Sequence, residues 1–70
     1  MIKGNKVKVL HVPTGDTYYE TSQAKEEYLK TVGKEGIITY VTGGYPHIFD
    51  VKFEGDDQTY SYEQYELELV

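Results

Sequence analysis

The chain has 70 residues, of which 39% are hydrophobic and 27% charged, and its formal net charge is −5. A chain this short predicts one domain, residues 1–70, near the size at which a single hydrophobic core suffices. The sequence has no cysteine, which excludes disulfides and thiolate metal sites, and no apolar run of membrane-spanning length, so we expect a soluble protein without a membrane partner.

The first predicted strand covers residues 6–12. Val7 and Val9 alternate with lysines, which predicts that the two valines face the core. The turn at residues 12–15 has proline at its second position and glycine at its fourth, and it ends this strand.

A helix is predicted over residues 22–32. Thr21 or Ser22 can cap its first turn, and Gly33 is placed to end it. The apolar residues recur every four positions, so we expect the helix to pack through Tyr28 and Val32.

Four further strands follow the helix. They are predicted at residues 36–41, 47–54, 58–62 and 67–69, with a 3₁₀ turn at 63–65 before the last one. Phe49, Val51 and Phe53 alternate toward a core that should also contain Leu67 and Leu69. Strands this short bury a core only by curling, so the prediction is a mainly β protein in which the final strand pairs with the first and closes a small five-stranded barrel.

Several residues resemble the pattern of SH3-like barrels, in particular that of the small photosystem I accessory subunit. They are Gly4, Lys6, Val7, Val9, Leu10, Val32, Gly33, Gly36, Ile37, Ile38, Tyr45, Pro46, Ile48, Asp50, Val51, Phe53, Tyr62, Glu66, Leu67 and Val70. The helix inserted between the first and second strands resembles the YorP family of small bacterial and prophage proteins. This resemblance implies an SH3-like barrel and a bacterial cytoplasm, and since that family has no assigned function it implies no active residues.

Residues 33–41 also resemble the core of a KOW motif, which occurs in proteins that bind RNA or RNA polymerase. Other features argue against nucleic acid as a partner. Residues 45–70 carry one lysine against seven carboxylates, and arginine, the side chain best suited to bidentate phosphate contacts, is absent. We therefore expect nucleic-acid binding to be disfavoured.

No catalytic or metal-binding pattern is present in the sequence. His11 and His47 stand apart from further ligands, so both are interpreted as ordinary strand residues. Ser22 is interpreted as a helix cap, and Ser61 belongs to a hairpin strand without a nucleophile elbow. We expect no catalytic residue, no metal and no cofactor.

Aromatic and acidic loop residues are the candidates for a binding surface. The candidate partner-binding residues are Tyr18, Tyr19, Tyr45, Pro46, Asp56 and Asp57. The first long connection and the loop after the second predicted strand can approach one rim of the barrel, which would place tyrosines beside carboxylates. Peptide-binding SH3 domains use a comparable aromatic groove, although this chain lacks the tryptophan that such grooves usually contain.

The expected function is therefore that of a non-enzymatic protein interaction module. Its expected partner is a host or phage protein with a basic surface, met by a monomer in the cytoplasm of a bacterial host. Two alternatives stay open: a KOW-like accessory domain that binds RNA or RNA polymerase, and a structural subunit of a phage assembly.

Overall fold

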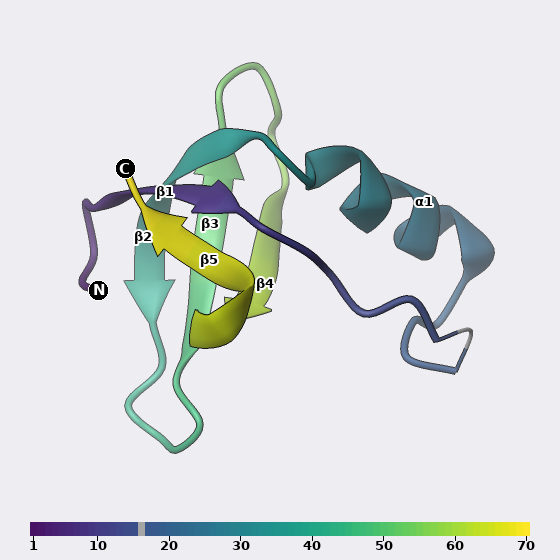
Figure 1. The fold of residues 1–70 in the computed structure, drawn as a ribbon, viewed down its shortest axis with the longest axis horizontal. Helices are drawn as coiled ribbons and strands as arrows, with labels where there is room; N and C mark the ends of the chain where they lie inside the picture. The colour runs from purple at the N-terminus through teal and green to yellow at the C-terminus, as the bar shows by residue number, and fades with distance from the viewer. Residues whose placement is uncertain (16) are drawn as a thin grey trace.

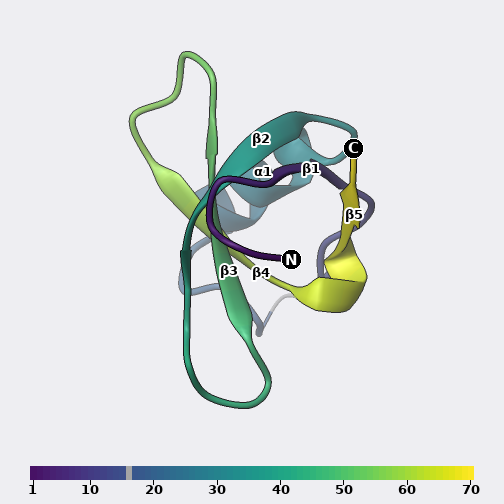
Figure 2. The same cartoon turned by 90° about the vertical axis from the view of Figure 1, so that its left-hand side faces the viewer.

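The computed structural model describes residues 1–15 and 17–70. Its elements are β1 (Lys6–Val9), α1 (Ser22–Thr31), β2 (Glu35–Val41), β3 (Ile48–Phe53), β4 (Thr59–Glu63), a 3₁₀ turn (Gln64–Glu66) and β5 (Leu67–Leu69). The strands form one antiparallel sheet in the order β4-β3-β2-β1-β5, which curls around a common interior (Figures 1 and 2). The mainly β class, the five strands and the helix inserted between the first two are confirmed.

The sheet is open between β4 and β5. The final strand pairs with β1, as predicted, with Glu68 opposite Lys8. β4, however, lies at the other edge of the sheet and pairs only with β3 in the described part of the chain. Two of its backbone N–H groups are occupied by side chains, since Ser61 donates to the Tyr28 hydroxyl at 3.0 Å and Glu63 donates to Glu66 Oε1 at 2.8 Å. These side chains take the place of a neighbouring strand at the edge of β4.

The core lies on the concave side of the sheet. Its buried residues are Val7, Val9, Val12, Ile38, Phe49, Val51, Phe53, Tyr60, Tyr62 and Leu67. The predicted inward positions on β1 and β3 are thereby confirmed. The prediction for Leu69 is wrong: its side chain is 55% exposed, because β5 ends there at the rim of the sheet.

Gly36 allows β2 and β3 to approach closely. A Cβ atom built on Gly36 would lie 2.7 Å from the Lys52 carbonyl oxygen and 2.7 Å from a methyl group of Val51. A larger residue would therefore push two paired strands apart at the centre of the sheet.

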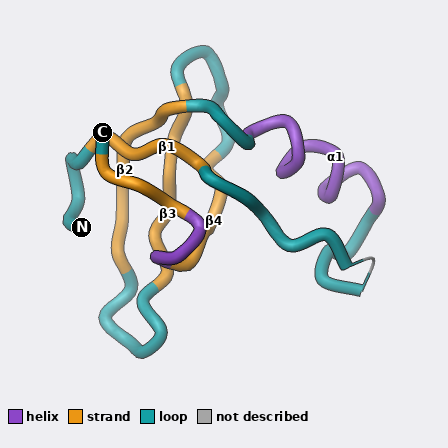
Figure 3. The backbone as a smooth tube through the Cα atoms, in the orientation of Figure 1, coloured by secondary structure: helices purple, strands orange, loops and turns teal. Residues whose placement is uncertain are grey.

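The helix α1 lies to one side of the curled sheet (Figure 3). Thr21 is its N-cap and accepts from the N–H of Ala24 at 3.0 Å, and Gly33 follows it with φ of +88°. The predicted packing through Val32 is wrong. Val32 is half-exposed because the backbone has already left the helix there, and the buried residue is Thr31, whose hydroxyl accepts from Tyr62 at 2.7 Å.

Several predicted boundaries move by a single residue, and the largest shift is in the first strand. The first strand ends at Val9 rather than Val12, and the 3₁₀ turn begins one residue later than expected, at Gln64. The N–H of Leu10 still donates to the carbonyl of Glu66 at 2.8 Å, which ties the end of β1 to this turn. Within the described residues, no helix has the length and apolar character needed to cross a membrane.

Candidate functional site

The loop between β2 and β3 carries Tyr45 and Pro46, which are joined by a cis peptide bond. Tyr45 is 96% exposed, so its ring lies outside the core. The base of the loop is fixed, because Thr42 Oγ1 accepts from the N–H of Ile48 at 2.8 Å and the Thr42 carbonyl lies 3.0 Å from His47 Nδ1. A rigid base thus presents an exposed aromatic ring.

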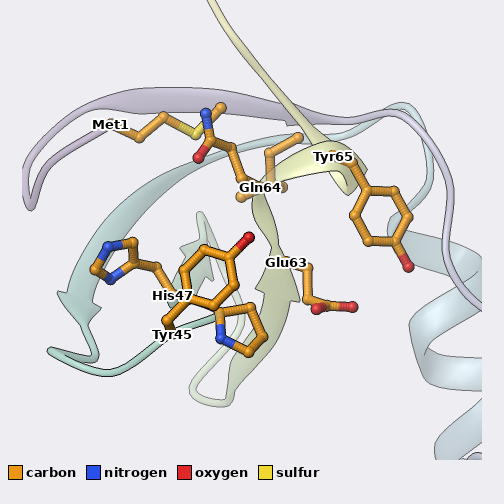
Figure 4. A pocket seen from close by; sticks show the side chains of 8 residues that line it. Met1, Tyr45, His47, Glu63, Gln64 and Tyr65 are labelled. Atoms are coloured by element: carbon orange, nitrogen blue, oxygen red, sulfur yellow. The ribbon is translucent and has the colours of Figure 1, made fainter.

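This loop forms one wall of a shallow cleft of about 510 Å³. The residues that line the cleft are Met1, Tyr45, Pro46, His47, Glu63, Gln64, Tyr65 and Leu67. They come from the N-terminal segment, the β2–β3 loop, the end of β4, the 3₁₀ turn and β5 (Figure 4). The cleft combines aromatic and aliphatic side chains with one carboxylate, which suits a segment of a protein better than a small polar molecule.

Tyr18 and Tyr19 lie in the connection before α1. Tyr19 is half-buried: its hydroxyl donates to the Pro13 carbonyl at 2.7 Å, and its ring lies 5.4 Å from the ring of Tyr28. Tyr18 packs edge-on against Tyr19 at 5.0 Å but is itself 59% exposed. Tyr19 therefore anchors the connection, and Tyr18 is the residue of this pair that a partner can reach.

The 3₁₀ turn brings two glutamates together. Glu63 and Glu66 form a capping box, in which Glu66 Oε1 accepts from the N–H of Glu63. Glu66 is only 2% exposed, and its second oxygen, Oε2, is buried without a hydrogen-bond partner among the described residues. A buried carboxylate oxygen without a donor is costly, so it marks a position where folding has left an acceptor unsatisfied.

Burial raises the pKa of Glu66 above its ordinary value of 4.5. The backbone hydrogen bond from Glu63 and the charge of His11 lower it, whereas the carboxylate of Glu63 raises it further. The charge of Glu66 is in turn the first cause of the raised pKa of the Tyr65 hydroxyl. The pKa of Tyr18 is raised by burial and then by Glu66 and Glu63.

We name five residues the Glu66 cluster: His11, Tyr18, Glu63, Tyr65 and Glu66. His11 belongs to it because its ring lies 5.4 Å from that of Tyr65. In Figure 4 the side chains of Glu63 and Tyr65 point toward the side on which α1 lies, whereas Tyr45 and His47 lie on the other side of the end of β4. Glu63 and Tyr65 are therefore on a different side of β4 from Tyr45 and His47.

The candidate residues of the sequence fall into two places. Tyr45 lines the cleft together with Glu63, and Tyr18 lies within electrostatic reach of Glu63 and Glu66, so the 3₁₀ turn is close to both. Asp56 and Asp57 lie in the β3–β4 hairpin, at the opposite end of β3 from Tyr45 (Figure 1). The two aspartates and Tyr45 therefore do not belong to one small binding site.

Asp56 is also occupied within its own turn. Its Oδ1 accepts from the N–H of Gln58 at 2.9 Å, and its Oδ2 accepts from the Tyr60 hydroxyl at 3.1 Å. Burial and this hydrogen bond raise the pKa of Tyr60 to about 12. These contacts make Asp56 a turn residue that also anchors a core tyrosine.

Sequence reasoning missed His11, Glu63, Tyr65 and Glu66 as site residues. The spacing of Glu63 and Glu66, two acidic residues three positions apart at the start of a helical turn, is the signal that could have indicated them. The contact between the rings of His11 and Tyr65 could not be predicted from a local sequence pattern, because the two residues are far apart in the sequence. Within the described part of the chain, no group of three potential ligands is placed to hold a metal ion.

The comparisons with known proteins leave the site to be argued from its geometry. The chain matches no protein-family model, and no curated protein and no solved structure is significantly similar to it.

Proposed function

We propose that this protein is a non-enzymatic interaction module that binds an extended segment of another protein in the cleft beside the 3₁₀ turn. The observation that carries the proposal is the cleft itself, in which a fully solvated Tyr45 stands over apolar and acidic side chains from separate parts of the chain. Exposed tyrosines of this kind are enriched among the residues that contribute most to protein interfaces.

The charge of the cleft supports a basic partner. Glu63 lines the cleft, its N–H donates to the Glu66 carboxylate, and residues 45–70 as a whole carry seven carboxylates against one lysine. Such a field attracts a basic segment and repels a phosphate backbone, and its effect on the association rate falls as salt rises.

The wider setting belongs to the same proposal. We place the protein among YorP-like proteins of phage or prophage origin, acting as a monomer in a bacterial cytoplasm on a host or phage protein. Its open sheet would then be an SH3-like barrel in which the 3₁₀ turn spans the gap between β4 and β5. The pairing of β1 with both β2 and β5 supports this relationship.

Affinity capture from a bacterial lysate tests the proposal. The immobilised baits are the natural protein, the variant Tyr45→Ala and the control variant Tyr40→Ala. Tyr40 is a suitable control because it too is exposed, at 59%, but lies on β2 outside the cleft. We expect a partner that survives nuclease treatment and binds Tyr45→Ala about tenfold more weakly than the other two baits.

Two results would contradict the proposal. Capture that disappears after nuclease treatment would favour the KOW-like alternative. Equal loss of binding in Tyr45→Ala and Tyr40→Ala would show that the binding surface is not confined to the cleft.

A further inference from the structure

The unpaired oxygen of Glu66 calls for a ligand that donates hydrogen bonds. Glu66 is only 2% exposed, and its Oε2 has no hydrogen-bond donor among the described residues. Its Oε1 accepts from the N–H of Glu63. A buried carboxylate is stabilised when a charged donor pairs with it and fills its remaining acceptor position. The orientation of Oε1 is already fixed, so the carboxyl group is preorganised for such a donor.

The surroundings of Glu66 favour a cation with a flat, weakly hydrated head group. The rings of His11 and Tyr65 lie 5.4 Å apart with an interplanar angle of 41°, and the hydroxyls of Tyr65 and Tyr18 both lie within electrostatic reach of the Glu66 carboxylate. The carboxylate of Glu63 adds a second negative charge. Arginine stacks on aromatic rings and pairs with carboxylates through several parallel donors, which a lysine ammonium does less well.

An arginine for this position has to come from another protein, because the sequence contains none. The basic side chain that lowers the pKa of Glu66 is His11, whose ring lies 5.4 Å from that of Tyr65. Tyr65 is 60% exposed and Tyr18 59% exposed, so a partner side chain can reach both rings of the cluster.

We propose that the Glu66 cluster is a receptor for an arginine side chain of the bound protein segment, whose guanidinium donates to Glu66 Oε2 and lies against the rings of Tyr65 and Tyr18. The inference rests on the proposed function, because it names the side chain of the bound protein segment that the Glu66 cluster recognises. Glu63 completes the site by pairing with the other edge of the guanidinium.

Titration with small probes tests this receptor directly. The probe is Nα-acetyl-arginine amide, followed through the side-chain carboxyl carbon of Glu66 and the backbone amides of Glu63 and Tyr65 by NMR. We expect saturable shifts at these three positions, a several-fold weaker response to Nα-acetyl-lysine amide, and none to tetramethylammonium, which has no hydrogen-bond donor. An equal response to tetramethylammonium, or no response of Glu66 to the arginine probe, would overturn the proposal.

The variant Glu66→Gln supplies the matched control. Its amide oxygen can still accept from the N–H of Glu63, so the capping box is kept while the charge is removed. We expect it to bind the arginine probe about tenfold more weakly than the natural protein. Unchanged binding would overturn the proposal, and the titration of the natural protein decides the matter even if this variant does not fold.

The failure of this inference can be told apart from the failure of the proposed function. If Tyr45→Ala loses the captured partner and Glu66→Gln retains it at full affinity, the protein-binding function stands and the arginine receptor is wrong. If neither variant changes capture, both are wrong.

Discussion

Two acidic turns lie at the two ends of β4, and they differ in how their carboxylates are used. In the β3–β4 hairpin, both oxygens of Asp56 accept hydrogen bonds, from the N–H of Gln58 and from the Tyr60 hydroxyl. In the 3₁₀ turn, one oxygen of Glu66 accepts from Glu63 and the other is buried without a partner among the described residues. The hairpin holds more acidic residues, yet the 3₁₀ turn holds the unsatisfied acceptor.

The difference shows that the number of charges does not identify a site. Three carboxylates in the hairpin are exposed or used locally, as aspartates in turns generally are. A single glutamate in the 3₁₀ turn has lost its hydration without gaining a full set of donors, and this imbalance gives it the capacity to bind a cation.

The largest expected effect tests what holds the hairpin turn in place. Phe53, which precedes this turn, is 4% exposed, and its ring lies 5.6 Å from that of Tyr60. We expect Phe53→Ala to lower the free energy of unfolding by about 3–5 kcal/mol, because it removes a buried aromatic ring. The exposed neighbour Glu54 is the control, and Glu54→Ala should change stability by less than about 0.5 kcal/mol. Chemical denaturation measures both, and similar values would show that carboxylates rather than the core hold the turn.

The next effect concerns the end of the helix α1, whose Tyr28 ring lies 5.1 Å from that of Tyr60 in β4. Gly33 has φ of +88°, and its N–H donates to the Val9 carbonyl at 2.8 Å. A Cβ there would meet no atom within 4 Å, so the cost of Gly33→Val is that of the backbone conformation, about 1–2 kcal/mol.

Gly43→Val is the matched control for this prediction. Gly43 also has open space around a Cβ but does not have a positive φ, so the change should be nearly neutral in thermal unfolding. A loss at Gly43 as large as that at Gly33 would contradict the assignment of the cost to the left-handed backbone.

Alternation and turn residues were sufficient to predict the strands. Phe49, Val51 and Phe53 alternate in a way that fits one strand register, and their inward orientation is confirmed. The helix was predictable from its cap and from Gly33, and its packing through Tyr28 is confirmed, but the other half of its buried face was not predictable. Val32 has the more apolar side chain, whereas Thr31 is the buried residue because its hydroxyl meets that of Tyr62, a contact across 31 positions that no local pattern reveals.

The candidate site was likewise predictable only where a local sequence pattern indicates it. The exposed loop tyrosines Tyr18 and Tyr45 could be named from their positions in polar connections. Glu66 was missed, although its spacing from Glu63 is that of a capping box, because a glutamate beside Leu67 in a short final segment resembles an exposed strand residue. Its burial follows from the 3₁₀ turn that folds its carboxyl back onto Glu63.

The smallest effect tests the comparison of the two turns directly, because the same chemical change should act in opposite directions. Asp56→Asn weakens the hydrogen bond that Tyr60 donates, so we expect a loss of less than about 1 kcal/mol in the free energy of unfolding. Glu66→Gln removes a buried charge and keeps the acceptor for Glu63, so we expect it to stabilise the protein at neutral pH.

The pH dependence gives this last prediction its sign. Because burial raises the pKa of Glu66 in the folded protein above 4.5, the folded state binds more protons than the unfolded state in the range above that value. The stability that protonated Glu66 contributes is therefore fully present below about pH 4.5 and is lost as the pH rises through the raised pKa. Urea denaturation of the natural protein and Glu66→Gln at a series of pH values should show an advantage of the variant that grows with pH and then levels off. A difference independent of pH, or a variant that loses stability relative to the natural protein as the pH rises, would mean that Glu66 is as well satisfied as Asp56.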